Sequence, residues 1–178
     1  MDGHILCTDR FDGHVRIDVG GHDLHQSPPL GGGRKRGAFN NAIGRSRGGQ
    51  TTKIHALTDD IGRPLAFIVT AGNTHDLAGA HSLIGMVQPP RRLLADRAYD
   101  ANSLRQELAQ RRIKAVIPPN PTRKNPHPYD KAAYKGRNVI ERMFCRLKDF
   151  RRIATRYDKR ADTFLSAVML AAALTWWT

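Results

Sequence analysis

Two carboxylates stand where a strand and a helix could present them for chemistry. Asp96 directly follows the apolar run 93–95, which predicts a short buried strand, and open α/β sheets commonly build their sites at the carboxyl ends of strands. Position alone is equally compatible with an aspartate that caps a turn. Glu141 lies in a basic segment of helical periodicity, where it also fits a solvated ion-pair partner of Arg137. Neither residue is therefore assigned a role by its position alone.

Four residues around Glu141 have gaps that favour a functional interpretation. Tyr134, Arg137, Glu141 and Lys148 are separated by two, three and six residues. On a helix, Arg137, Glu141, Arg142 and Lys148 fall near one side. The apolar stripe of the same helix consists of Ile140, Phe144 and Leu147. A helix that buries this stripe would present the charged residues together.

This Tyr-Arg-Glu-Lys spacing resembles that of the bacterial insertion sequence transposases of the DDE type. The segment 94–100, Leu-Ala-Asp-Arg-Ala-Tyr-Asp, is similar to their second-aspartate motif, and it contains Asp96. Four further segments are similar in order to the insertion-sequence-five (IS-five) family: 44–57, 72–76, 116–119 and 150–158. The resemblance covers about residues 34–177. It predicts a DNA transposase that cleaves and transfers strands at the ends of an insertion sequence.

The resemblance implies an RNase H-like α/β fold, in which helices flank a mixed sheet whose first three strands are antiparallel. It also implies that two aspartates and a helical glutamate bind two Mg²⁺ ions, for which Mn²⁺ can substitute. Asp96 and Glu141 would be the second and third of these metal-binding, catalytic carboxylates. Mg²⁺ prefers oxygen ligands, and ions about 3.5–4 Å apart can activate the attacking oxygen and stabilise the leaving one. Water attack would nick a strand, and a freed 3′-hydroxyl would join it to target DNA.

Around such a centre, the basic side chains of the same helix have a specific use. Arg137 would bind a phosphate beside the scissile bond through paired hydrogen bonds, and Lys148 would bind one as a point charge. Tyr134 would stack or hydrogen-bond nearby. The alternative is surface charge that only solvates the helix.

The first aspartate of the family motif has no counterpart with the expected surroundings. Asp18, in a predicted short strand at 15–19, is the nearest positional candidate. The codons of residues 21–29, taken one nucleotide later, permit Asp-Thr-Thr-Ser-Ile-Arg-Ala-His, which is the expected motif. We therefore hypothesise that 1–33 is an irregular segment translated out of frame, with an incomplete first strand, and that 34–178 is the catalytic domain.

A missing first carboxylate would weaken metal binding, because two of three carboxylates hold two Mg²⁺ ions poorly. The alternative function is therefore a catalytically inactive DNA-binding fragment that regulates transposition. The nucleotide sequence around the codons of Gly21 and His22 tests the hypothesis, since the shifted frame must contain an aspartate codon there.

Composition indicates a polyanionic partner. The formal net charge is +13, from 29 Lys and Arg against 16 Asp and Glu. The basic residues are spread from Arg34 to Arg160 and are not gathered beside an apolar span, so DNA is favoured over a membrane. Arg45 and Arg47, in a glycine-rich segment, either contact the DNA backbone without reading sequence or simply solvate a loop. We expect a homo-oligomer in the active state and no small-molecule substrate.

Other features favour structural interpretations. Cys7 and Cys145 lack metal-type spacing, and the chain shows no secretion leader or membrane span, which favours a reducing cytosol. The resemblance implies a bacterial protein that is associated with the nucleoid. The pair His75-Asp76 fits a helix cap at Asp76 better than a metal site. Trp176 and Trp177 fit core or edge packing better than a platform for base stacking.

The elements that must position these residues follow from the apolar pattern and the turn residues. Strands are predicted at 52–57 and 64–70, joined as a hairpin, and at 93–95 and 113–117. Helices are predicted at 76–87, 100–112, 131–152 and 163–177. A proline-rich connection is predicted at 118–128.

Overall fold

A computed structural model describes the backbone of residues 14–23, 41–46 and 49–178, and the side chains of 41–45 and 50–178. The strands are β1 (His14–Asp23), β2 (Gly44–Ser46), β3 (Gly49–Thr58), β4 (Pro64–Ala71), β5 (Arg92–Ala95) and β6 (Lys114–Val116). The α-helices are α1 (Asp76–Met86), α2 (Asn102–Gln110), α3 (Lys131–Tyr134), α4 (Asn138–Lys148), α5 (Arg151–Ala154) and α6 (Ala161–Trp176). Short 3₁₀ turns lie at η2 (Arg97–Tyr99) and η3 (Lys135–Arg137).

A single mixed sheet forms the middle of the molecule. Within it, β1 pairs antiparallel with β3 on one side and parallel with β5 on the other. The strand order is β2-β3-β1-β5-β6, and β4 pairs with β3 as well. The long strands β1, β3 and β4 are antiparallel to their neighbours in this group. The strands β5 and β6 continue the sheet in parallel from β1. The predicted mixed sheet with three antiparallel strands is therefore confirmed.

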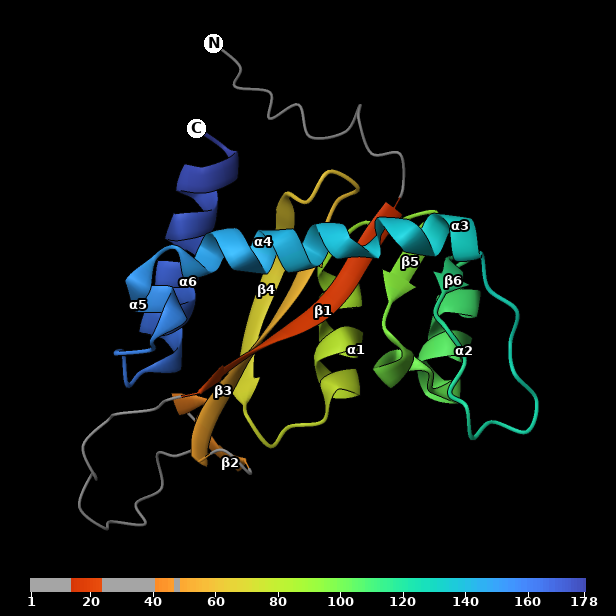
Figure 1. The fold of residues 1–178 in the computed structure, drawn as a ribbon, viewed down its shortest axis with the longest axis horizontal. Coiled ribbons are helices and arrows are strands. Elements are labelled where there is room, and N and C mark those ends of the chain that lie inside the picture. Colours follow the sequence, from red (N-terminus) through yellow and green to blue (C-terminus); the bar gives the residue numbers. More distant parts are fainter. Residues whose placement is uncertain (1–13, 24–40, 47–48) are drawn as a thin grey trace.

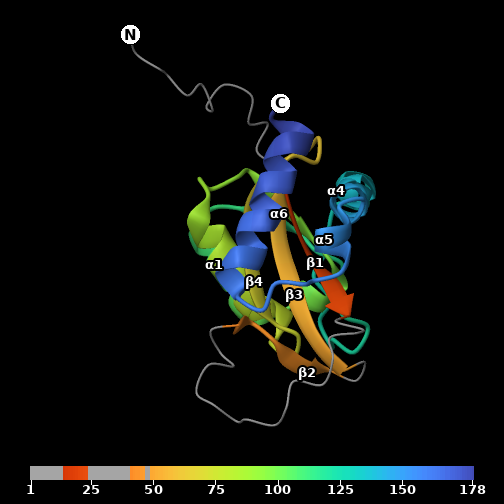
Figure 2. The same ribbon diagram turned by 90° about the vertical axis from the view of Figure 1, so that its left-hand side faces the viewer.

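Helices cover both faces of this sheet, and the alternation of side chains along β3 explains why. Leu57 packs into a core with α1 and α2, whereas Ile54 and Ala56 pack into a second core with α4, α5 and α6. Successive side chains of a strand point to opposite faces, so one strand supplies both cores. Figure 2 shows the resulting three layers, with the sheet between α1 and α4.

The β3–β4 hairpin agrees with the prediction because its turn chemistry is local. The Asp59 carboxylate accepts hydrogen bonds from the backbone amides of Ile61 and Arg63, at 3.2 and 2.7 Å. Gly62 has a φ of +93°, which favours glycine over other residues. Its neighbour across the turn is Val139 of α4, because a β-carbon built on Gly62 would lie 2.6 Å from the Val139 Cγ1. The turn therefore packs against α4.

The structure corrects three expectations. The first strand is longer than 15–19: β1 pairs with β3 without interruption from Arg16 to Asp23, so the expected incomplete first strand is wrong. The predicted helix 131–152 is interrupted by η3 and ends at Lys148, with α5 following separately. The cap of α1 is His75, whose ring accepts a hydrogen bond from the Leu77 amide, and Asp76 is the first residue of the helix.

Candidate active site

Asp96 stands directly after β5, at the carboxyl end of a buried parallel strand. Leu93, Leu94 and Ala95 are buried and fix the strand in the sheet. The Asp96 backbone then starts η2, with its carbonyl accepting a hydrogen bond from the Tyr99 amide at 2.9 Å. Its side chain is 39% exposed, so the carboxylate faces the surface. Asp96 therefore occupies the position at which a sheet of this kind can build a site.

Arg137 links the two predicted carboxylates. Its Nη1 lies 3.2 Å from the Asp96 Oδ2, and its Nη2 donates a hydrogen bond to the Glu141 Oε1. Asp96 and Glu141 are 45 positions apart in the sequence, and this shared guanidinium brings them to one place. Figure 1 shows α3 and α4 lying in a line across β1. Asp96 and Glu141 thus contact the same guanidinium, although they come from different elements.

Tyr134 completes the contacts of Asp96. Its hydroxyl donates a hydrogen bond to the Asp96 Oδ1 at 3.0 Å. Burial, together with this bond to a carboxylate, raises the pKa of Tyr134 to about 12. The phenol therefore stays protonated at neutral pH and acts as a donor. The Arg137 guanidinium lies 5.9 Å from the Tyr134 ring centroid, and Tyr129 packs edge-on against the same ring.

Asp18 occupies the strand position beside Asp96. In the parallel pairing of β1 with β5, Ile17 is the partner of Ala95. One residue further along each strand are Asp18 and Asp96, so the register places Asp18 level with Asp96 in neighbouring strands. The side chains of β1 lie outside the described residues, so the register applies to the backbone alone. Asp23, five residues further, pairs with Thr51 at the far end of β3.

The predicted DNA-binding residues fall into two groups. Lys148 is exposed and ends α4, about 10 Å along the helix axis from Glu141 at 1.5 Å per residue. Arg45 is exposed on β2, where it pairs with Gln50, six residues along β3 from the partner of Asp18. At about 3.3 Å per residue this is about 20 Å, so the structure does not bring Arg45 into the carboxylate site. Arg47 lies outside the described residues.

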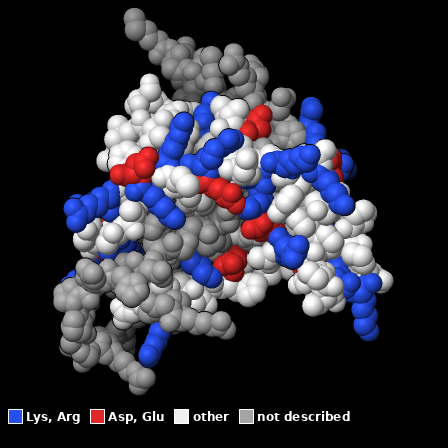
Figure 3. All heavy atoms as spheres, in the orientation of Figure 1, with Lys and Arg blue, Asp and Glu red and all other residues white. Residues whose placement is uncertain are grey.

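The Lys and Arg side chains are not confined to this site. Figure 3 shows them spread across the face that α4 covers, with Asp and Glu side chains among them. A phosphate backbone that approached α4 would therefore meet positive charge on several sides of the carboxylates.

Asp100 holds the segment that follows Asp96 in place, and the sequence analysis did not identify this role. Its side chain is fully buried and accepts hydrogen bonds from Arg105 Nε at 2.6 Å, Arg123 Nε at 3.0 Å and the Asn120 amide at 2.7 Å. Burial alone would raise the pKa of Asp100, but these bonds hold it below its usual value. Through these hydrogen bonds, Asp100 holds the proline-rich connection 118–128 against the segment that follows Asp96. Its place four residues after Asp96 in the quoted motif was the available signal.

The pair His75-Asp76 is structural in the described chain. Asp76 accepts a hydrogen bond from Lys53 Nζ at 2.7 Å, and His75 caps α1. Within the described residues, no three His, Cys, Asp or Glu side chains group as metal ligands would. No helix in the same part of the chain is long and apolar enough to cross a membrane.

The sheet order and the helix that crosses it define an RNase H-like fold, and solved structures share this fold. The HTLV-2 integrase catalytic core domain in complex with magnesium aligns with a TM-score of 0.52 at 11% identity, over 91% of this chain and 84% of that one. The BIV integrase catalytic core domain gives 0.50 at 16% identity, over 91% and 82%. A chain of the simian T-cell lymphotropic virus intasome gives 0.51 at 12%, but this chain spans only 47% of it.

Sequence comparison then gives the family. Residues 15–176 match the family model described as transposase DDE domain. A candidate transposase of insertion sequence element IS6501 from Brucella ovis is 41% identical over 127 residues, which cover 71% of this chain and 98% of that protein. A candidate transposase of IS402 from Burkholderia cepacia is 34% identical over 148 residues, covering 77% and 67%. The chain belongs to the DDE transposases of insertion sequences, and its function is that of a DNA transposase. The narrower IS-five assignment stays a prediction.

Proposed function

We propose that Asp96 and Glu141, joined by Asp18, bind the divalent cations with which this transposase cleaves and transfers DNA strands at the ends of its insertion sequence. The observation that carries the proposal is the guanidinium of Arg137, which contacts both described carboxylates. A position that holds a cation between two carboxylates also suits a hard metal ion with oxygen ligands. The residues present therefore fit Mg²⁺ or Mn²⁺ in kind. Such ions would supply activation of the attacking oxygen and stabilisation of the leaving one.

Asp18 is proposed as the third carboxylate because of its register. Parallel strands bring residues at matching positions side by side, and Asp18 is one residue beyond the Ile17–Ala95 pair. The alternative is an aspartate encoded in the shifted frame over Gly21 and His22, with 34–178 as the catalytic domain. Under that alternative the present chain is an inactive DNA-binding fragment that regulates transposition. This alternative is kept because the surroundings of Asp18 in the sequence do not match those of the first aspartate in the family motif.

The protein side chains around the carboxylates have separable roles. Arg137 and Lys148 bind phosphates that flank the scissile bond, and Tyr134 orients Asp96 through its hydroxyl. Arg45 and Arg47 add affinity for the DNA backbone away from the site. The active form is a homo-oligomer that holds the element ends and the target DNA, working in the bacterial cytoplasm at the nucleoid.

A cleavage and strand-transfer assay tests the proposal. The substrate is a DNA fragment with the ends of the element that encodes this chain, incubated with Mg²⁺ or Mn²⁺. We expect cleavage by the wild-type chain and its loss in Asp96→Asn, Glu141→Gln and Asp18→Asn. Asp23→Asn, on the same strand as Asp18, is the matched control and should remain active. Binding without cleavage in the wild-type chain would instead support the regulatory fragment.

A further inference from the structure

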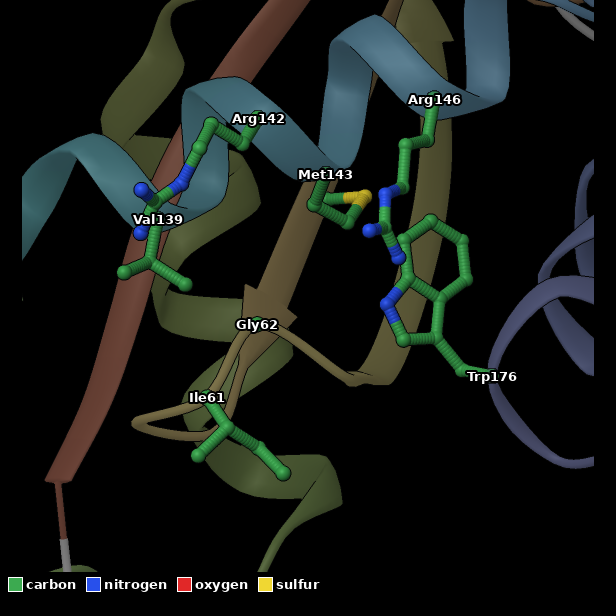
Figure 4. A pocket seen from close by; sticks show the side chains of 7 residues that line it. All are labelled: Ile61, Gly62, Val139, Arg142, Met143, Arg146 and Trp176. Atoms are coloured by element: carbon green, nitrogen blue, oxygen red, sulfur yellow. The ribbon is translucent and has the colours of Figure 1, made fainter.

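A pocket of about 270 Å³ lies on the edge of α4 that faces away from Glu141. Its sides are Arg142 and Arg146 of α4, the turn at Ile61 and Gly62, and Trp176 of α6. Figure 4 shows the two arginines on either side of Met143, with the Arg146 guanidinium beside the indole of Trp176. The pocket therefore joins three elements that are far apart in the sequence.

The helix period places this pocket and the carboxylate site on opposite edges of the same helix. Ile140, Met143, Phe144 and Leu147 form the buried face of α4. At 100° per residue, Glu141 and Lys148 border this face on one side, whereas Arg142 and Arg146 lie on the other side of the helix. Arg142 therefore does not share the side of Glu141, contrary to the prediction. A strand of DNA that crosses α4 from the carboxylate site would therefore reach the pocket.

The charge of the pocket is uncompensated. Within the described part of the chain, neither Arg142 nor Arg146 forms an ion pair with a carboxylate, in contrast to Arg137. Both arginines line the pocket, so an anion inside it would meet positive charge from two sides. Arginine binds phosphate oxygens through paired, directional hydrogen bonds. The chemistry of the two side chains thus points to a phosphate.

The indole of Trp176 adds a flat apolar surface beside these charges. Trp176 packs against the core formed by α4, α5 and α6, which holds the ring in place. The Arg146 guanidinium lies 5.9 Å from the ring centroid. Stacking of a base on an aromatic ring contributes about 1–3 kcal/mol and does not depend on which base it is. An acidic peptide would use the guanidiniums but would not need the indole, so the set favours a nucleotide.

We propose that the pocket binds one nucleotide of the DNA strand that passes Glu141. Its phosphate lies between Arg142 and Arg146, and its base lies against Trp176. The proposal rests on the proposed function, because the strand reaches the pocket only if its scissile phosphate lies at Glu141. The predicted packing role of Trp176 is retained, since the same side chain packs against the core and also lines the pocket.

Binding of a short, fluorescently labelled single-stranded oligonucleotide, measured by anisotropy without divalent cations, tests the pocket separately from catalysis. We expect the double variant Arg142→Gln, Arg146→Gln to bind roughly tenfold more weakly, and the slope of log affinity against log salt to fall by about 0.7 for one lost phosphate contact. Trp176→Leu should weaken binding without changing that slope. Arg91→Gln, an exposed arginine outside the pocket, is the matched control and should change the affinity less.

Three outcomes would overturn the proposal that the pocket binds a nucleotide. The first is an equal loss of affinity in Arg91→Gln and in the double variant, which would indicate general charge. The second is unchanged binding by the double variant. The third is tighter, arginine-dependent binding of a polyglutamate peptide than of the oligonucleotide, which would assign the pocket to an acidic protein partner. Asp96→Asn should keep its oligonucleotide affinity, so a failure of cleavage and a failure of the pocket remain distinguishable.

Discussion

Replacing Arg137 by glutamine removes the guanidinium that joins Asp96 to Glu141. Without divalent cations the two carboxylates then face each other with less compensating charge, so the folded state loses stability. With divalent cations present, an ion that binds these carboxylates no longer has to displace the guanidinium. We therefore expect Arg137→Gln to lower stability in a chelator and to raise the affinity for Mg²⁺.

The structure sets the size of both effects. Arg137 is 19% exposed, whereas the carboxylates of Asp96 and Glu141 are 39% and 50% exposed, so solvent screens both ion pairs. Exposed pairs contribute roughly 0.2–1 kcal/mol each, and together about 1 kcal/mol is expected here. For a chain of this length, that corresponds to a decrease of about 2–4 °C in the unfolding midpoint. In the variant, Mg²⁺ no longer has to break these ion pairs, and the same free energy of about 1 kcal/mol corresponds to about fivefold tighter Mg²⁺ binding.

Thermal unfolding in chelator and across a Mg²⁺ titration measures both quantities, because a ligand that binds only the folded state raises the midpoint with its concentration. Arg142→Gln, on the same helix, is the control and should show the wild-type response to Mg²⁺. If Arg137→Gln keeps the wild-type midpoint in chelator and the wild-type shift in Mg²⁺, the guanidinium does not compete with the metal, and the proposed ligand pair is wrong.

Three further predictions concern the scaffold. Burial lowers the pKa of His55 from its usual 6.5 to about 4. As the pH falls, the unfolded chain therefore takes up a proton before the folded chain does, and the free energy of unfolding should fall by up to about 3 kcal/mol between pH 6.5 and pH 4. Urea unfolding should show less of this pH dependence in His55→Gln. Arg156→Met removes a buried guanidinium that donates to the backbone carbonyls of Asn41, Ala42, Asp158 and Lys159, and it should cost about 3 kcal/mol. Urea unfolding measures the loss, and a value under about 1 kcal/mol would contradict the network. Gly62→Ala should cost about 1–2 kcal/mol through its positive φ and its contact with Val139, whereas Gly85→Ala, which has open space, should be neutral or stabilising by calorimetry.

Patterns in the sequence were sufficient to predict the strands and helices that depend on neighbouring residues alone. The alternating apolar residues and the Asp59 turn predicted the β3–β4 hairpin, and the apolar runs predicted β5 and β6. The break between α3 and α4 was not predicted, because the charged residues around Gly136 are compatible with a continuous helix and only the packing of the chain selects a 3₁₀ turn there. The full length of β1 was missed for a similar reason: its pairing with β3 is tertiary, and its own sequence lacks alternation.

The candidate site likewise has features that could be predicted from the sequence and features that could not. The spacing of Arg137 and Glu141 could be predicted, because they are four residues apart where η3 continues into α4. The contact of the Arg137 guanidinium with both Glu141 and Asp96 could not, since it depends on how α4 crosses β1 in the folded chain. The buried ion pairs of Asp100 were equally out of reach, because their partners come from α2 and from the proline-rich connection.

The place of β1 in the sheet has a consequence for cooperativity. The antiparallel group with β3 and the parallel group with β5 share no strand pairing except through β1 in the described sheet. The sheet is therefore complete only when β1 is paired with both halves, and β1 must pair with strands that follow it in the chain. A change in the sequence of 14–23, by mutation or by a shift of reading frame, therefore acts on both halves of the sheet at once.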